Sequence, residues 1–255
     1  MQMKGMVAIV TGASRGLGKA IAIEYAREGA KVVACSRPQS PTGLSGTATE
    51  TAAEIGSQGG EALGIPCDVT NEAQVKAMVD QVMERYGRID VLVNNAGLMI
   101  VGEPFLDIEP ERWDSLMSVN IRGPYLCCRH VLPVMMKQRR GSVINIGSRM
   151  GIEVTAGGGT AYSASKAALH MISHTLAEEM REHNIAVNIL SPGSLRSEGA
   201  WVIPWNRRNW DIRIEPAENG PCAVYLALQT ADSMTGQYVH IDNFGKTWGQ
   251  VSSPR

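Results

Sequence analysis

A short apolar segment that runs into a glycine-rich turn near the N-terminus constrains the fold of this chain more than any other feature. Residues 7–10 are apolar and predict a buried strand. The following turn contains Gly12, Gly16 and Gly18, and residues 17–28 show the apolar spacing of a helix. Glycines let the backbone approach a pyrophosphate closely, and the free N–H groups at a helix start attract its charge. The stretch therefore predicts the start of a dinucleotide-binding βαβ unit, although its Gly-x-x-x-Gly-x-Gly spacing differs from the commoner Gly-x-Gly-x-x-Gly.

The size and charge of the chain narrow the classes of partner. Its 255 residues, 44% of them apolar, are enough for one globular domain with a large core, and we assign residues 1–255 to a single domain. The net charge of −1 gives no reason to expect nucleic acid or a membrane surface as a partner. No apolar run is long enough to span a membrane, and the first strand begins too early to leave room for a signal peptide. We therefore expect a cytoplasmic protein.

The cysteines and histidines do not predict a metal site. The five cysteines show no Cys-x-x-Cys spacing and lie in apolar contexts, so we interpret them as reduced core residues. His170 and His174 share one face of a predicted helix without an acidic ligand pattern beside them. We expect these two histidines to contact a neighbouring helix or a second subunit.

The residues after the second predicted strand (31–35) bear on the choice of cofactor. An NAD site usually has Asp or Glu about 20 residues beyond the glycine turn, where it binds the ribose 2′-hydroxyl. Ser36 and Arg37 occupy that place here, so no carboxylate repels a 2′-phosphate and a guanidinium is available to bind it. Arg15, inside the turn, could reach the same phosphate. We therefore expect NADP rather than NAD; in the alternative interpretation both arginines are ordinary surface residues.

Predicted strands and helices alternate along the rest of the chain, which favours an α/β fold with a parallel sheet. We expect a Rossmann-type, doubly wound parallel sheet of about seven strands with helices on both faces. The further strands are predicted at 62–66, 89–97, 142–147, 185–190 and 237–241, and the further helices at 48–57, 75–86, 110–137, 162–182 and 217–228.

Polar residues follow predicted strands at the edge where ligands of open α/β sheets bind. Asp68 could accept a hydrogen bond from the adenine amino group, or it could cap the next helix. Ser148 follows the strand at 142–147 and stands where chemistry is expected. Tyr162 and Lys166 are four residues apart on the next predicted helix, so their side chains lie on one face and can interact.

Four motifs in this order resemble the short-chain dehydrogenase/reductase family in its basic single-domain form. They are Thr11-Gly-x-x-x-Gly-x-Gly18, Asn94-Asn-Ala-Gly97, Tyr162-x-x-x-Lys166 and Pro192-Gly193, within a similarity that covers residues 5–242. The resemblance implies an oxidoreductase that transfers a hydride between NADP(H) and a small alcohol or carbonyl substrate. The chain departs from the family at Asn243, where glycine is usual, and in residues 194–215, which form a rather short substrate lid by resemblance.

The residues of these motifs support hydride transfer coupled to proton transfer. Tyr162 would act as general acid/base, its pKa lowered by Lys166 and by the positive nicotinamide of the oxidised cofactor. Ser148 would hydrogen-bond the substrate oxygen. By resemblance, Asn120 would hold a water that links Lys166 to solvent. The resemblance implies no metal, and it implies cofactor binding by Gly12, Ser14, Arg15, Gly16, Leu17, Gly18, Ser36, Arg37, Asp68, Val69, Asn95, Ala96, Gly97, Tyr162, Lys166, Pro192, Gly193, Leu195 and Ser197.

Two other classes of function remain open. A non-catalytic NADP-binding sensor or scaffold could keep the fold, although such a protein tends to lose its proton-transfer residues, which are all present here. An epimerase or dehydratase could use the same site through a transient oxidation.

The lid and two of the helices suggest how the chain meets its partners. Trp201, Trp205 and Trp210 could line an apolar substrate pocket or could anchor the lid to the body. The predicted helices at 110–137 and 162–182 carry apolar residues on more than one side. A second apolar stripe needs a partner, so we expect a homodimer or a homotetramer, as the resemblance also implies.

Overall fold

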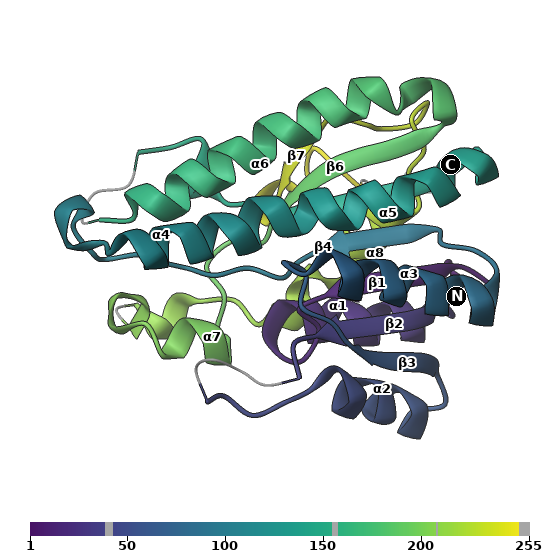
Figure 1. Ribbon diagram of the computed structural model, residues 1–255, viewed down its shortest axis with the longest axis horizontal. Coiled ribbons are helices and arrows are strands. Elements are labelled where there is room, and N and C mark those ends of the chain that lie inside the picture. The colour runs from purple at the N-terminus through teal and green to yellow at the C-terminus, as the bar shows by residue number, and fades with distance from the viewer. Residues whose placement is uncertain (39–42, 155–157, 208, 250–255) are drawn as a thin grey trace.

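Seven parallel strands form the centre of the computed structural model, which describes residues 1–38, 43–154, 158–207 and 209–249 (Figure 1). The order across the sheet is β3-β2-β1-β4-β5-β6-β7. This arrangement confirms the expected doubly wound α/β fold. The strands are β1 Val7–Thr11, β2 Lys31–Ser36, β3 Glu61–Pro66, β4 Val91–Asn94, β5 Gly141–Ile146, β6 Ile185–Ser191 and β7 Tyr238–His240.

Helices pack on both faces of this sheet. Two separate apolar clusters, one on each face, account for most of the buried core. One face is covered by α1, α2 and α8, and the other by α3, α5 and α6. The helices are α1 Gly16–Arg27, α2 Ala48–Ser57, α3 Glu72–Tyr86, α4 Pro110–Met117, α5 Gly123–Gln138, α6 Thr160–Glu179, α7 Glu198–Trp201 and α8 Gly220–Ala227.

The strand order reverses between β1 and β4, and this reversal determines where a ligand can bind. The chain runs from β1 outwards to β3 and then crosses back to place β4 on the other side of β1. Loops leaving the carboxyl ends of β1 and β4 therefore turn in opposite directions and open a crevice between them. The glycine turn follows β1, and Asn95 follows β4, so both lie at this crevice.

The helix predicted at 110–137 differs from the observed one in a single place. A π-helical turn, Ser118–Arg122, joins α4 to α5 and carries Asn120. Pro124 explains why the α-helical pattern fails there, because proline has no N–H to donate to the carbonyl of Asn120, four residues earlier. Such single π turns are frequent at functional sites.

Other expectations at the level of elements hold with shifted boundaries. The last predicted helix, 217–228, begins as the 3-10 turn Pro216–Asn219 and continues as α8. The helix bearing Tyr162 ends at Glu179 and is followed by a 3-10 turn, Arg181–His183. All five cysteines are free and buried, as expected. Within the described ranges, no helix has both the length and the apolar character that a membrane crossing needs.

Candidate active site

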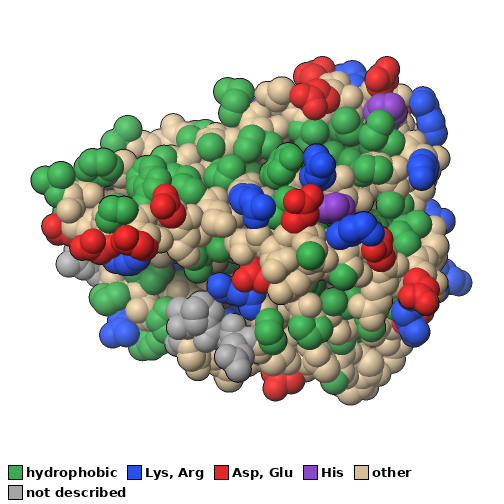
Figure 2. Space-filling view, viewed as in Figure 1, with side chains coloured by type: hydrophobic (Ala, Val, Ile, Leu, Met, Phe, Trp, Pro, Cys, Tyr) green, Lys and Arg blue, Asp and Glu red, His purple; other side chains and the backbone are tan. Residues whose placement is uncertain are grey.

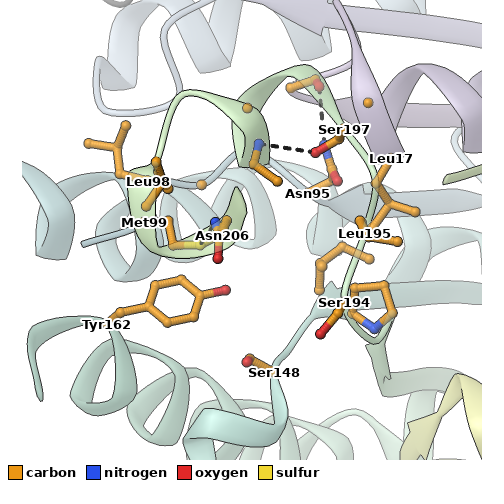
Figure 3. A pocket seen from close by; sticks show the side chains of 18 of the residues that line it. Leu17, Asn95, Leu98, Met99, Ser148, Tyr162, Ser194, Leu195, Ser197 and Asn206 are labelled. Atoms are coloured by element: carbon orange, nitrogen blue, oxygen red, sulfur yellow. Dashed lines mark hydrogen bonds between the residues drawn. The ribbon is translucent and has the colours of Figure 1, made fainter. Parts of the chain in front are cut away.

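A cavity of about 1100 Å³ lies at the carboxyl edge of the sheet, over the crevice between β1 and β4. Its wall comes from the ends of β1, β2, β4, β5 and β6 and from the lid (Figure 3). Its lining includes every residue predicted to bind the cofactor or take part in catalysis except Gly18 and Asn120. The structure thus brings together residues that are up to 185 positions apart, from Gly12 to Ser197.

The glycine turn is fitted to its surroundings so closely that side chains are excluded. Gly12 and Gly16 have φ angles of +64° and +53°, a region that favours glycine. A Cβ on Gly12 would lie 2.8 Å from the Cα of Ala96, and one on Gly18 would lie 2.5 Å from the carbonyl oxygen of Gly12. Glycine at positions 12 and 18 therefore lets the turn pack closely against the end of β4, and Gly12 and Gly16 line the cavity where a pyrophosphate would bind.

Thr11 and Asn95 hold this turn against the end of β4. The Thr11 hydroxyl donates to the carbonyl of Val93 at 3.1 Å and accepts from the backbone N–H groups of Asn95 and Ala96. The Asn95 amide donates to the carbonyls of Thr11 and Gly12, at 2.8 and 3.1 Å. Sequence reasoning placed Asn95 at the cofactor but missed Thr11, although the threonine stands inside the glycine motif.

Arg15 and Arg37, the two arginines expected at a 2′-phosphate, differ in their surroundings. Arg15 donates from Nε to the carbonyl of Ser45 and from Nη2 to those of Leu44 and Gly46, so it fastens the loop before α2. Arg37 lines the cavity, and its guanidinium makes no hydrogen bond or ion pair within the described part of the chain. The hydroxyl of Ser36, which also lines the cavity, accepts from the N–H of Ala48. Of the two arginines, Arg37 therefore has the guanidinium available for a phosphate.

Asp68 supports a turn and also faces the cavity. Its Oδ1 accepts from the backbone N–H and the hydroxyl of Thr70, at 2.9 and 2.8 Å. The cap of α3 is Asn71, whose side chain accepts from the N–H of Gln74. Because Asp68 lines the cavity beside Val69, the turn still presents it toward the expected adenine position.

Ser148, Tyr162 and Lys166 meet at one end of the cavity. Figure 3 shows the hydroxyl groups of Tyr162 and Ser148 directed into the same open space. Lys166 is buried, and its Nζ donates to the carbonyl of Ile146 at 2.7 Å and lies 5.5 Å from the centre of the Tyr162 ring. β5 thus positions Ser148 and anchors Lys166, while α6 carries Lys166 and Tyr162 one turn apart.

Burial dominates the ionisation of this group. It raises the pKa of Tyr162 to about 12, although the Ser148 hydroxyl, which can stabilise the phenolate, lowers it. Burial also lowers the pKa of Lys166 to about 8. Without the cofactor, burial therefore outweighs the hydrogen bond from Ser148. The expectation that Lys166 and the positive nicotinamide together lower the pKa of Tyr162 stays a prediction.

Asn120 is fixed by its side chain to two other segments. Its Oδ1 accepts from the N–H of Leu98 at 2.8 Å, and its Nδ2 donates to the carbonyl of Leu98 and to the hydroxyl of Ser165. Ser165 in turn donates to the carbonyl of Tyr162 at 2.7 Å. Asn120 therefore links the segment after β4 to α6, the helix that carries Tyr162 and Lys166. Its role in holding a water for proton relay stays a prediction.

His170 is a further residue of the site that the sequence did not reveal. Its buried ring accepts from the backbone N–H of Ser148 through Nε2, at 3.3 Å. The ring also lies edge-on to Tyr238, with centroids 5.2 Å apart. A Cβ on Gly147 or Gly151 would lie 2.5 or 2.7 Å from the ring, so these glycines make room for it.

The histidines expected at a neighbouring helix or subunit contact loops of their own chain instead. Burial and the positive charges of Lys166 and His174 lower the pKa of His170 to about 4, so its imidazole is neutral. Nδ1 of His174 lies 3.0 Å from the carbonyl of Gly236. His170 is buried, whereas His174 is only partly buried, so a contact of His174 with a second subunit stays a prediction. In the described residues, no group of three or more His, Cys, Asp or Glu side chains is placed to hold a metal ion.

The lid uses its tryptophans in both of the ways considered. Trp205 lines the cavity and packs closely over Gly102. Trp201 and Trp210 instead contact each other edge to face, with ring centroids 4.8 Å apart, and line a separate groove against α1. The two ends of the lid meet where Leu195 pairs with Ile214, and Ser197 caps α7 within it. Arg208, within the predicted lid, lies outside the described residues.

Comparisons with known proteins agree with this geometry. Residues 6–205 match the family model described as short chain dehydrogenase. The 3-oxoacyl-[acyl-carrier-protein] reductase FabG of Thermotoga maritima is 35% identical, over 95% of this chain and 98% of that protein. The uncharacterised oxidoreductase YxjF of Bacillus subtilis is 34% identical, over 94% and 98%.

Solved structures with similar folds have comparable identities. A short-chain type dehydrogenase/reductase from Mycobacterium marinum has a TM-score of 0.84 at 34% identity and covers 96% of this chain and 97% of its own. A metagenomic short-chain oxidoreductase, solved in complex with NADP, has a TM-score of 0.77 at 36% identity, with coverages of 94% and 98%.

Proposed function

Because the chain belongs to the short-chain dehydrogenase/reductase family of oxidoreductases, which use a nicotinamide cofactor, we propose that it transfers a hydride between NADP(H) and an alcohol or ketone. One observation carries this proposal: Tyr162, Ser148 and Lys166 converge on one end of a cavity whose other end is a glycine turn. The substrate is a small molecule, and we expect the enzyme to act in the cytoplasm.

The residues present fit the cofactor. The backbone at Gly12 and Gly16 suits a pyrophosphate, and Arg37 suits a 2′-phosphate. Lys166 and the segment from Pro192 to Ser197 would hold the nicotinamide half. When bound, NADP(H) supplies or accepts the hydride.

The side chains at the catalytic end handle the proton and the substrate oxygen. Ser148 donates a hydrogen bond to that oxygen and stabilises the charge that develops on it. Tyr162 gives its hydroxyl proton to the oxygen during reduction and takes a proton from the alcohol during oxidation. The raised pKa of Tyr162 keeps the phenol protonated in the chain alone, the state that reduction needs. Lys166 then returns a proton to Tyr162. The pKa of the Lys166 ammonium is about 8, close to neutral pH, so it can release and regain this proton.

Arg37 and the residue types after β2 support NADP over NAD. No carboxylate occupies the position where NAD sites usually hold the ribose, and the Arg37 guanidinium has no partner among the described residues. The similar metagenomic oxidoreductase was solved with NADP, which is consistent with this preference.

An assay with both cofactors tests the proposal. Purified protein is incubated with NADPH or NADH and a panel of ketones, aldehydes and the matching alcohols, and absorbance of the reduced cofactor is followed. We expect turnover of at least one ketone, with a higher kcat/KM for NADPH than for NADH. Tight NADPH binding without any turnover would contradict the proposal and favour a sensor. Epimerisation or dehydration of a substrate without net oxidation or reduction of the cofactor would favour an epimerase or a dehydratase.

A further inference from the structure

Arg213, in the lid, is a cavity-lining arginine that the proposed reaction does not yet use. Its Nη1 donates to the carbonyl of Leu195 at 3.3 Å, and its Nη2 donates to Oδ1 of Asn206 at 3.1 Å. The guanidinium also lies 5.8 Å from the centre of the Trp210 ring, which restricts its orientation. Two neutral oxygens and a ring therefore hold this cation in place.

The charge of Arg213 has no acidic partner in the part of the chain that the structure describes. Desolvation is what lowers its pKa, with no carboxylate acting against that loss. Its Nε is buried and has no hydrogen-bond partner among the described residues. An unpaired buried donor on a cation is costly, so a ligand that supplies an anion would be stabilised there.

Other cations at this end of the cavity are already satisfied. Nη2 of Arg149 lies 3.1 Å from Oδ2 of Asp242, and its Nε lies 3.8 Å from Oε1 of Glu153. Lys166 donates to the carbonyl of Ile146. Unlike Arg149, Arg213 has no carboxylate beside it in the described part of the chain, although its guanidinium donates to two neutral oxygens.

Asn206 connects Arg213 to the reacting groups. It is buried, comes from the 3-10 turn Pro204–Arg207, and lies beside Met99 and above Tyr162 in Figure 3. Its Nδ2 contacts the sulfur of Met99 at 3.6 Å, a weak bond that leaves this donor able to bind a better acceptor. Asn206 and Arg213 both line the cavity that contains Tyr162 and Ser148, so their amide and guanidinium groups can bind a ligand in it.

We propose that Arg213, with Asn206, binds a carboxylate carried by the substrate, so that the enzyme acts on short oxo acids and the matching hydroxy acids. This inference rests on the proposed function and specifies its substrate class. The other source of an anion is the cofactor itself. The glycine turn already provides N–H groups for the pyrophosphate, and Arg37 is available to the 2′-phosphate, which leaves Arg213 for the substrate.

Matched acid and ester substrates test the inference. We use acetoacetate with its methyl ester, and levulinate with its methyl ester, because the ester removes the charge of the carboxyl group and adds only one methyl group. The wild type should have a higher kcat/KM for the acid of at least one pair. Arg213→Met should raise KM for that acid about ten-fold or more, the cost of a lost charge-assisted hydrogen bond, and leave KM for the ester nearly unchanged. Arg213→Lys should restore part of the loss.

Two further variants sharpen the comparison. Asn206→Asp keeps the size of the side chain but places a carboxylate against Arg213, so it should weaken acid binding while sparing the ester. Arg207→Met is the matched control, since Arg207 is an exposed lid arginine that donates to the carbonyl of Trp201. It should leave the acid preference intact.

The outcomes separate this inference from the proposed function. Equal losses for acid and ester in Arg213→Met, or a wild type that prefers the esters, would overturn it. If Arg213→Met raised the dissociation constant for NADPH and left the acid preference unchanged, Arg213 would belong to the cofactor site. That result would overturn the inference as well. If the wild type turns over no substrate, the proposed function fails. Calorimetric binding of levulinate to the NADP-bound wild type and to Arg213→Met then decides the inference alone: binding lost in the variant supports it, and equal or absent binding overturns it.

Discussion

Ser148 is held from behind by a neutral histidine on the helix that carries Tyr162 and Lys166. His170 accepts the backbone N–H of Ser148 at 3.3 Å and packs its ring between Gly147 and Gly151. A residue that fixes the backbone of Ser148 also fixes where its hydroxyl meets the substrate, and small displacements of such groups are costly to catalysis.

We predict that His170→Leu lowers kcat more than it lowers NADPH affinity, because leucine fills the space but cannot accept the Ser148 N–H. His170→Gln should recover part of kcat, since its Oε1 can occupy the position of Nε2 and accept that bond. Both variants are compared by steady-state kinetics and thermal unfolding. Equal kcat values for the two variants at equal stability would show that the hydrogen bond has no positioning role.

We predict that Arg37→Ala raises KM for NADPH by about ten-fold or more, while KM for NADH changes little, because only NADPH carries the 2′-phosphate. Arg15→Ala is the matched control. Since Arg15 holds the carbonyls of residues 44–46, its loss should affect both cofactors alike. A native preference for NADH, or the same change in both KM values for Arg37→Ala, would contradict the assignment.

At the level of residues, motifs predicted the groups that face the cavity and missed the groups that support them. Ser148, Tyr162 and Lys166 could be named because strand ends and helix spacing place them. His170 and Arg213 could not, since their partners lie far along the chain and pairing depends on how the segments pack. Arg15 shows the same limit: its position in the turn suggested a phosphate, and the fold of the loop 43–47 determined its partners.

At the level of elements, apolar periodicity located the strands and helices. The departures from regular helices and strands depend on single residues instead. The helix at 110–137 contains a π turn because Pro124 removes one donor, which averaged periodicity does not detect. The lid was recognisable as irregular from its composition. The split of its tryptophans, with Trp205 at the cavity and Trp201 against Trp210, depends on packing that spacing alone does not fix.

At the level of the whole molecule, alternation of strands and helices was enough to predict the doubly wound sheet, because parallel strands need crossover helices. The sequence pattern predicts less well which apolar residues of α5 and α6 are exposed. Several of the apolar residues on these two helices are buried inside the subunit, Leu126, Val131, Leu132, Met135 and Leu169 among them. Tyr125 and Met171 remain 52% and 66% exposed, and Figure 2 shows apolar side chains gathered along these helices.

We predict that this surface pairs with a second copy of the chain, giving a homodimer or a homotetramer. Exposed large apolar residues on two adjacent helices suit a two-fold interface. Light scattering at micromolar concentration should give two or four times the chain mass of 27.5 kDa. Tyr125→Glu with Met171→Glu should shift that mass toward the monomer. A wild type that stays monomeric would contradict the prediction.

Turnover by Tyr162→Phe tests the central claim, that this cavity transfers a proton together with a hydride, most directly. Phenylalanine keeps the ring packing but has no proton to exchange, so kcat for ketone reduction should fall by at least ~100-fold while NADPH binding and thermal stability stay near wild type. Tyr225→Phe, the same change at a tyrosine outside the cavity, should keep full activity. If Tyr162→Phe retained more than about a tenth of wild-type kcat, Tyr162 would not be the general acid/base and the proposed mechanism would be wrong.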